Sequence, residues 1–202
     1  MVIERVGIYG GTFDPVHVGH LAIAEEARWI CRLDRVVLVP VGHQPLKPEP
    51  HAATGAQRLR MLELACASNA AFVPSDIELR RPPPSYSIDT LEVLQAQFGS
   101  AVVIYFILGA DALIDLPRWH RVADLVALVQ LAVVARPGYT VDLDGLETHV
   151  PGIRERITWI NGPQLAIAST DLRRRCAAGQ PIRYQVPDPV YAYIEEHGLY
   201  RI

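Results

Sequence analysis

The stretch of residues 10–20 constrains the fold of this chain more than any other, because it joins an apolar run to a helical pattern. The run at residues 6–9 precedes it, and Leu21, Ala24 and Ala27 follow it at helical spacing. The stretch is therefore a strand-to-helix turn, and the two glycines at its start let the backbone pass close to a ligand. A helix N-terminus adds unpaired N–H groups and the positive end of a dipole. Such a turn suits a phosphate group.

Two histidines add chemistry to this turn. His17 and His20 lie three positions apart. If the helix begins near Pro15 or Val16, both imidazoles project from one face of its first turn, and Gly19 leaves that face open. A double glycine alone is common as a tight turn, and one histidine would be no more specific. Folding alone does not require two histidines beside a glycine turn, so the combination predicts phosphate chemistry.

Length and composition indicate one globular domain without a strong charge. The chain has 202 residues, of which 50% are hydrophobic, and a formal net charge of −3. This length predicts a single domain over residues 1–202, with a small helical portion at about 169–202. The weak charge argues against a nucleic-acid partner, and no segment is long and uncharged enough to span a membrane. The three cysteines are far apart and form no metal-binding pair, which predicts a cytoplasmic protein with no metal site of its own.

Strand and helix patterns alternate along the chain. The run at residues 102–108 is apolar throughout, which predicts a central parallel strand buried on both faces. Further strands are expected at residues 6–9, 35–39, 131–135 and 157–160, and an extended segment runs from residue 72 to residue 80. The alternation predicts an α/β protein with a Rossmann-like, doubly wound parallel sheet in a three-layer α/β/α arrangement.

Local patterns also predict details of two helices. The helix expected at residues 56–69 is amphipathic, and its pattern turns Arg58 and Arg60 outward. A second helix follows residue 86. Its cap is either Asp89, which has capping-box spacing to an acid three residues later, or Ser87.

A long loop at residues 40–54 carries the only lysine of the chain, Lys47, among 19 basic Lys and Arg residues. Several prolines in this loop prevent regular backbone pairing, and long loops in compact domains often act as lids. Lysine offers a compact point charge where arginine offers a planar fork, so Lys47 is a candidate functional group.

The sequence GGTFDPVHVGH resembles the signature of the nucleotidyltransferase superfamily, whose H-x-G-H or T-x-G-H element holds the phosphates of a nucleoside triphosphate. Within it, nearly the whole chain resembles the bacterial nicotinate mononucleotide adenylyltransferases. The resemblance implies transfer of an adenylyl group from ATP to nicotinate mononucleotide, which gives deamido-NAD and pyrophosphate in NAD biosynthesis.

The resemblance extends to a second phosphate motif near the end of the chain. IASTDLR is similar to the family's I-S-S-T-x-x-R motif at the triphosphate, with Ala168 in place of the first serine. From the residues alone, Ser169 or Thr170 is expected to cap a helix whose first turn carries Arg173.

The resemblance implies four catalytic residues: His17, His20, Lys47 and Arg173. Residues 109–111, which follow the apolar run, match the family's G-A-D element at the nucleotide. The residues expected to bind ATP lie in this element and the two phosphate motifs, and they are Gly10, Gly11, Thr12, Phe13, Asp14, Gly19, Gly109, Asp111, Ile167, Ser169, Thr170 and Arg173.

Two further departures from the family pattern lie at the loops. Lys47 matches the lysine of a P-P-H-K segment, in which Leu46 replaces the histidine. Residues 85–91 resemble an S-Y-T-x-D-T-L element whose backbone amides are associated with recognition of the nicotinate carboxylate, and Pro83 replaces a glycine before it. Trp119 is expected to stack on the pyridine ring. The residues expected to bind the nicotinate nucleotide are Tyr86, Ser87, Trp119, His120 and Arg136.

The expected cofactor is Mg²⁺, held mainly by the ATP phosphates, because the sequence shows no dedicated carboxylate cage. The expected partners are the small molecules ATP and nicotinate mononucleotide, and the sequence leaves a homo-oligomer open. Two alternatives remain open as well. One is another nucleotidyltransferase of the superfamily, with nicotinamide mononucleotide, pantetheine phosphate or a cytidylyl reaction. The other is a non-catalytic nucleotide-binding domain.

Overall fold

The computed structural model describes residues 4–43, 51–136, 138–163 and 165–201. The chain divides into two compact units, each assembled from segments that are distant in sequence. The first unit comprises Met1–Gly10, Ile23–Val37 and Tyr86–Gln164, and the second comprises Gly11–Ala22, Leu38–Ser85 and Leu165–Ile202. The expectation of one domain over residues 1–202 stays a prediction.

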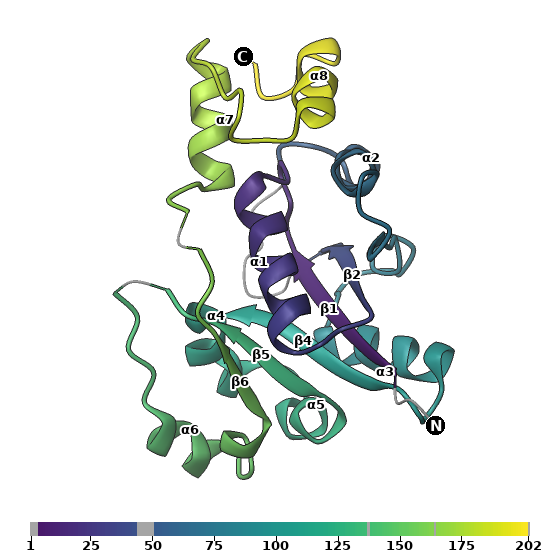
Figure 1. Ribbon diagram of the computed structural model, residues 1–202, viewed down its shortest axis with the longest axis vertical. Coiled ribbons are helices and arrows are strands. Elements are labelled where there is room, and N and C mark those ends of the chain that lie inside the picture. The colour runs from purple at the N-terminus through teal and green to yellow at the C-terminus, as the bar shows by residue number, and fades with distance from the viewer. Residues whose placement is uncertain (1–3, 44–50, 137, 164, 202) are drawn as a thin grey trace. The chain divides into compact units, whose positions relative to one another are not determined.

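The described strands form a six-stranded sheet in the order β3-β2-β1-β4-β5-β6 (Figure 1). Their bounds are β1 (Arg5–Gly11), β2 (Arg35–Pro40), β3 (Phe72–Pro74), β4 (Val103–Gly109), β5 (Gln130–Val134) and β6 (Ile157–Ile160). Strand β4 pairs in parallel with β1 and β5, and β5 pairs in parallel with β6. The strand order reverses direction after β1, which is the doubly wound arrangement. The predicted Rossmann-like α/β fold is confirmed.

Helices connect the strands. Their bounds are α1 (Val18–Ile30), α2 (Gly55–Cys66), α3 (Ser87–Phe98), α4 (Ala110–Asp115), α5 (Val122–Leu128), α6 (Leu143–His149), α7 (Ser169–Ala177) and α8 (Asp188–Glu196), with short 3-10 turns η1 (Leu116–Arg118) and η2 (Arg154–Arg156).

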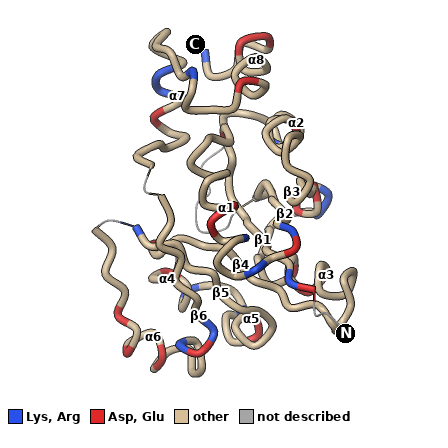
Figure 2. The backbone as a smooth tube through the Cα atoms, viewed as in Figure 1, with Lys and Arg blue, Asp and Glu red and all other residues tan. Residues whose placement is uncertain are grey.

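The core of the first unit is built on the neighbouring strands β4 and β5. Strands β4 and β5 contain no charged residue, and both are tan throughout in Figure 2. Ile104, Ile107 and Leu131 are almost completely buried. Burial of each such side chain contributes about 1.5–3 kcal/mol. Helices α3 and α5 pack against each other beside this sheet.

In the second unit, helix α2 packs against β3 and α8. It begins with a capping box: the N–H of Gln57 donates to the hydroxyl of Thr54 over 3.3 Å, and the N–H of Thr54 donates to the Gln57 side chain over 2.9 Å. The helix ends at Cys66, three residues earlier than the pattern predicted.

Several local predictions are wrong. Tyr86 occupies the capping position of α3, so neither Asp89 nor Ser87 caps that helix. The extended segment expected to reach residue 80 ends at Pro74. The chain turns there because the N–H of Arg80 bonds back to the carbonyl of Asp76, four residues earlier, over 3.1 Å.

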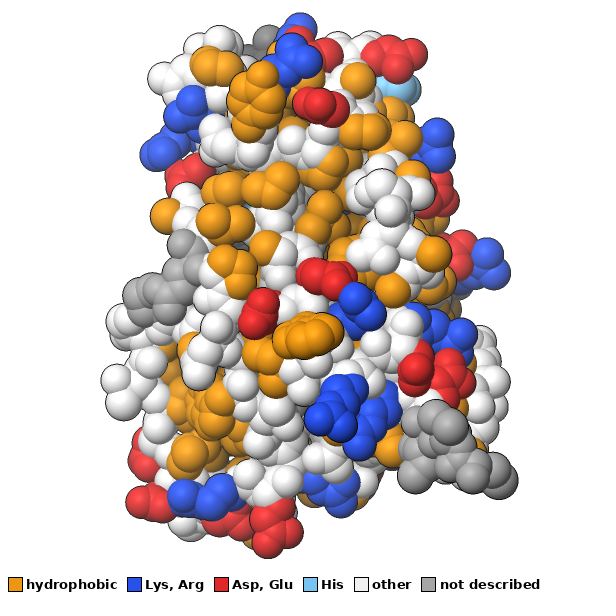
Figure 3. Space-filling view, viewed as in Figure 1, with side chains coloured by type: hydrophobic (Ala, Val, Ile, Leu, Met, Phe, Trp, Pro, Cys, Tyr) orange, Lys and Arg blue, Asp and Glu red, His pale blue; other side chains and the backbone are white. Residues whose placement is uncertain are grey.

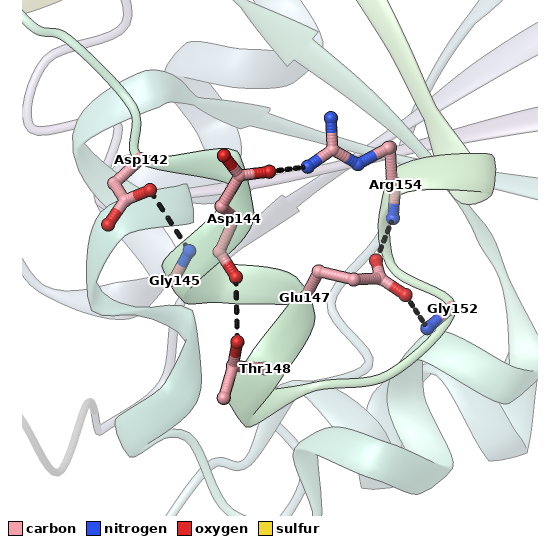
Figure 4. A network of polar contacts seen from close by, with 7 residues as sticks. All are labelled: Asp142, Asp144, Gly145, Glu147, Thr148, Gly152 and Arg154. Carbon is pink, nitrogen blue, oxygen red and sulfur yellow. Dashed lines mark hydrogen bonds and ion pairs between the residues drawn. The ribbon is translucent and has the colours of Figure 1, made fainter.

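The segment between β5 and β6 contains the short helix α6 and the 3-10 turn η2. Glu147 on α6 accepts hydrogen bonds from the N–H groups of Gly152 and Arg154, over 2.6 and 3.0 Å (Figure 4). The Arg154 side chain pairs with Asp144, and Asp142 caps the helix through the N–H of Gly145. This exposed segment is therefore ordered by its own polar contacts.

The described helices and the exposed hydrophobic side chains bear on membrane contact. Among the described residues, no helix combines the length and the apolar character needed to cross a bilayer. Large exposed hydrophobic side chains such as Trp29 and Tyr184 come from different elements, and Figure 3 shows hydrophobic side chains interspersed with polar and charged groups on the face in view. Scattered exposure of this kind is normal for a globular protein.

Candidate active site

The two histidines of the opening motif lie in contact within the second unit. Helix α1 begins at Val18 instead of near Pro15 or Val16, so His17 precedes the helix and His20 lies in its first turn. Their rings are nevertheless stacked, with centroids 3.6 Å apart and an interplanar angle of 24°. The two imidazoles therefore do not share one face of the first helical turn, as the sequence predicted, but their rings are in contact.

The backbone fixes the tautomer of His20. The N–H of His17 donates to Nδ1 of His20 over 3.2 Å. Because Nδ1 accepts this bond, the neutral ring carries its proton on Nε2. His20 therefore presents an N–H donor at the far side of its ring, which is the group required to bind a phosphate oxygen.

Two glycines leave room for the rings of this turn. A Cβ at Gly11 would lie 2.9 Å from the ring of Phe13, which packs edge-on against His20 at a centroid distance of 5.0 Å. A Cβ at Gly19 would lie 3.0 Å from Nδ1 of His17. A side chain at either position would therefore press on the ring of Phe13 or His17.

The side chain of Asp14 points into the interior of the second unit. Asp14 is 1% exposed, and its carboxylate accepts hydrogen bonds from the N–H groups of Ala52 and Ala53, over 2.8 and 3.2 Å. It also accepts a bond from the hydroxyl of Tyr200 over 2.7 Å. A buried carboxylate with three donors is well satisfied.

Helix α7 brings the second phosphate motif to the same turn. The hydroxyl of Ser169 donates to the carbonyl of Pro15 over 2.9 Å, and Nη1 of Arg173 donates to the carbonyl of Asp14 over 2.8 Å. Nη2 of Arg173 lies 3.4 Å from the hydroxyl of Thr170. The motifs at the two ends of the sequence therefore meet within one unit.

The expected cap of α7 is wrong. Ala168 occupies the capping position, while Ser169 and Thr170 are the first helical residues. The reason is that Ser169 uses its hydroxyl on the Pro15 carbonyl. Ile167 lies half-buried just before the helix.

Arg58 is a residue of this region that the sequence interpretation missed. It was expected to face outward, yet it is 1% exposed and its Nη1 donates to the carbonyl of Thr12 over 2.9 Å. Burial lowers the pKa of Arg58, and the nearby Asp14 opposes that shift. A signal was present: Arg58 shares a helical face with the buried residues Met61, Leu62 and Ala65, at spacings of i+3, i+4 and i+7.

Lys47 lies outside the described residues, as do all of residues 44–50. The residues before this segment are well anchored in the second unit. His43 and Ser85 exchange two hydrogen bonds, with the N–H of Ser85 donating to the His43 carbonyl over 2.9 Å and the N–H of His43 donating to the Ser85 hydroxyl over 3.2 Å. Nε2 of His51 bonds to the carbonyl of Gly42 over 3.2 Å.

The first unit holds the G-A-D element at the carboxyl end of β4. Asp111 lies in the first turn of α4, and its carboxylate is 3.5 Å from Nη1 of Arg136. A Cβ at Gly109 would lie 2.3 Å from Oδ1 of Asp111, so this turn requires glycine. Burial raises the pKa of the neighbouring Tyr9 to about 12, which keeps its hydroxyl neutral. The sequence interpretation missed Tyr9, because an aromatic residue in a buried strand looks like core. Gly10 follows it and is exposed.

The aromatic residues expected at the nicotinate ring form two pairs in the first unit. The rings of Tyr86 and His120 lie 4.2 Å apart at an angle of 30°. Trp119 is half-buried and packs edge-on against Phe106 at 6.0 Å. Ser87 is the first residue of α3, where backbone N–H groups are unpaired within the helix. These residues offer aromatic faces and N–H donors.

Comparison with known proteins defines the class. The cytidylyltransferase-like family model matches residues 8–175 of this chain, which contain both phosphate motifs. A protein of Roseiflexus sp. (strain RS-1) named "probable nicotinate-nucleotide adenylyltransferase" is 55% identical over 196 residues, covering 97% of this chain and 98% of the relative. A protein of the same name from Roseiflexus castenholzii is 52% identical over 201 residues and covers 100% of both chains. The chain therefore belongs to the cytidylyltransferase-like family and, within it, to the nicotinate-nucleotide adenylyltransferases.

A solved structure also shares the fold. The Plasmodium falciparum nicotinic acid mononucleotide adenylyltransferase complexed with NaAD superposes with a TM-score of 0.78 at 19% sequence identity, covering 98% of this chain and 97% of that chain. This likeness agrees with the Rossmann-like sheet described above.

Proposed function

We propose that this protein transfers the adenylyl group of ATP to nicotinate mononucleotide, forming deamido-NAD and pyrophosphate. The observation that carries the proposal is the meeting of two phosphate motifs at one turn, where His17 and His20 are stacked and α7 supplies Ser169 and Arg173. The names of the relatives support the same activity.

The reaction is an in-line displacement at phosphorus. An oxygen of the nicotinate mononucleotide phosphate forms a bond to the α-phosphorus of ATP, and the bond from that phosphorus to the bridging oxygen breaks. The electron pair leaves with pyrophosphate. A phosphate monoester is already an anionic nucleophile, so no covalent enzyme intermediate is required, and the protein supplies positioning and charge stabilisation.

We assign His20 the role of a neutral N–H donor to the α-phosphate, since the bond from the His17 N–H leaves the proton of the ring on Nε2. His17 is the second imidazole of this pair. Arg173 neutralises the departing pyrophosphate, and its bond to the Asp14 carbonyl holds the guanidinium in place. Lys47 is proposed for the same neutralising role from its family motif.

The acceptor is assigned to residues of the first unit. The aromatic faces of Tyr86, Trp119 and His120 suit a pyridine ring. The N–H groups at the start of α3 suit a carboxylate, because a helix N-terminus favours negative charge. Arg136, 3.5 Å from Asp111, is proposed as a cation for the acceptor.

The family implies Mg²⁺. We propose that ATP phosphates and water provide most of its ligands, because Mg²⁺ usually keeps several waters and binds through substrate phosphates. When bound, it would reduce the negative charge on the phosphates. The cytoplasmic location and a homo-oligomeric state stay predictions.

The experiment is a pyrophosphate-release assay with ATP and three acceptors: nicotinate mononucleotide, nicotinamide mononucleotide and pantetheine phosphate. We expect nicotinate mononucleotide to give the highest kcat/KM. A preference for another acceptor would assign the chain to the alternative transferase reaction. Binding of ATP by calorimetry without pyrophosphate release from any acceptor would select a non-catalytic nucleotide-binding domain.

A further inference from the structure

The turn before the two histidines, residues 12–17, has backbone carbonyl groups that accept hydrogen bonds from side chains of distant helices in the second unit. Arg58 of α2 donates to the carbonyl of Thr12 over 2.9 Å. Arg173 and Ser169 of α7 donate to the carbonyls of Asp14 and Pro15, over 2.8 and 2.9 Å. The position of this turn is therefore set by contacts between segments that are distant in sequence, and not by the turn itself.

The Asp14 carboxylate extends this network to the last residues of the chain. It accepts bonds from the N–H groups of Ala52 and Ala53, and the Tyr200 hydroxyl donates to Oδ1 over 2.7 Å. The first two donors belong to the backbone and remain in every variant, whereas the third depends on one side chain. Tyr200 is thus the donor to Asp14 that substitution can remove most cleanly.

The hydroxyl of Tyr200 contacts two side chains of the second unit. It lies 2.7 Å from Oδ1 of Asp14 and 3.9 Å from the sulfur of Met61. The backbone of Tyr200 has a φ of 65°, in the left-handed region. The contact with Asp14 is therefore the strong polar contact of this side chain.

The hydroxyl remains a donor under all relevant conditions. Burial raises the pKa of Tyr200, and the negative charge of Asp14 raises it further. The hydroxyl proton therefore stays between the two oxygens, and the contact is a charge-assisted hydrogen bond.

We propose that Tyr200 is a positioning residue for adenylyl transfer: its hydroxyl orients Asp14, and Asp14 in turn fixes the turn that presents His17 and His20. This inference rests on the proposed function. Tyr200 touches neither substrate nor reacting atoms in this role. Small displacements of a catalytic group reduce rates strongly, so loss of the hydroxyl is expected to affect turnover more than substrate affinity.

The test is Tyr200→Phe, which keeps the ring and removes only the hydroxyl. We expect kcat to fall about tenfold. The KM for nicotinate mononucleotide should stay within about twofold, because the acceptor residues are unchanged. The matched control is Tyr184→Phe, a change at a tyrosine that is 82% exposed, which should leave kcat unaltered. A Tyr200→Phe protein that is folded by circular dichroism and keeps its parental kcat would overturn the proposal.

A double-mutant cycle separates positioning from a merely structural role. In Asp14→Ala, the hydroxyl has lost its acceptor, so adding Tyr200→Phe should change kcat by less than about twofold. Multiplicative effects of the two substitutions would mean that Tyr200 acts by another route. If Asp14→Ala does not fold, the kcat of Tyr200→Phe decides alone.

The failure of the proposed function would be visible in the parental protein. If the parent releases pyrophosphate with none of the acceptors, the readout becomes the affinity for ATP measured by calorimetry. We then expect Tyr200→Phe to weaken ATP binding about fivefold, because the same turn would still hold phosphates. Unchanged ATP affinity would overturn the positioning role under that condition.

Discussion

Two carboxylates of this protein each accept two backbone N–H bonds, but one is buried and the other lies at the surface. Asp14 in the second unit accepts bonds from the N–H groups of Ala52 and Ala53, and Glu147 in the first unit accepts bonds from those of Gly152 and Arg154. Asp14 is 1% exposed, whereas the Glu147 network lies at the surface. Water can replace the bonds of an exposed carboxylate, but it cannot reach a buried one without disrupting the packing. The same hydrogen bonds therefore order a surface loop in one region and a functional turn in the other.

The histidines of the two regions differ in the direction of the hydrogen bond at Nδ1. Nδ1 of His20 accepts a bond from the His17 N–H, whereas Nδ1 of His149 faces the carbonyl of Gly145 at 2.7 Å and must donate. The neutral rings therefore carry their protons on different nitrogens. Of these two rings, His20 combines an Nε2 donor with a stacked histidine and a place in the first turn of α1, which supports its proposed role at a phosphate.

The largest expected effect is on the rate of adenylyl transfer. His20→Ala should lower kcat at least about a hundredfold, because it removes a donor to charge that develops in the transition state. His149→Ala, the matched change in α6, should retain the parental kcat. The measurement is pyrophosphate release at saturating ATP and nicotinate mononucleotide. Near-parental turnover by His20→Ala would refute the assignment of that residue.

The second expected effect is on stability. Arg58→Met should reduce the free energy of unfolding by about 2–4 kcal/mol, because the carbonyl of Thr12 loses its donor and Asp14 loses a nearby cation in a buried site. Arg154→Met removes an exposed ion pair and should cost about 0–1 kcal/mol. Urea unfolding followed by circular dichroism measures both. Equal losses in the two variants would show that burial does not distinguish these regions.

The smallest expected effect is a pH dependence at the exposed carboxylate. The N–H groups of Gly152 and Arg154 stabilise the charged form and lower the pKa of Glu147. A carboxyl whose pKa is lower in the folded state contributes stability above its unfolded pKa, and this contribution is lost as the pH falls through the folded pKa. Glu147→Gln should therefore lower Tm by about 1–2 °C at pH 7, and the difference should vanish in acid.

The control for this prediction is Glu155→Gln, which changes a carboxylate of η2 that is not part of the network in Figure 4. Its Tm should follow that of the parent across the pH range. A Glu147→Gln difference that grows as the pH falls would contradict the direction derived from the pKa.

Most elements of the fold could be predicted because their signals are local. The strand expected at residues 157–160 has the same bounds as β6, and the one at residues 35–39 differs from β2 by a single residue. Apolar runs and the glycine turn encode these elements within a few positions. Helix starts were less predictable, since Ser169 bonds to Pro15 instead of capping α7. A hydroxyl that has both local and distant partners cannot be assigned from its neighbours in sequence.

The features of the candidate site also fall into those that the sequence predicts and those that only the folded chain shows. The sequence by itself determined the strand-to-helix turn with its two histidines, the second phosphate motif and the α/β class, because each depends on residue types at short spacing. Only the tertiary structure decided that Arg58 donates to the carbonyl of Thr12 and that Tyr200 reaches Asp14, a residue 186 positions away. Hydrogen bonds between distant segments leave no periodic signal, so the groups that hold the turn in place become visible only when the chain is folded.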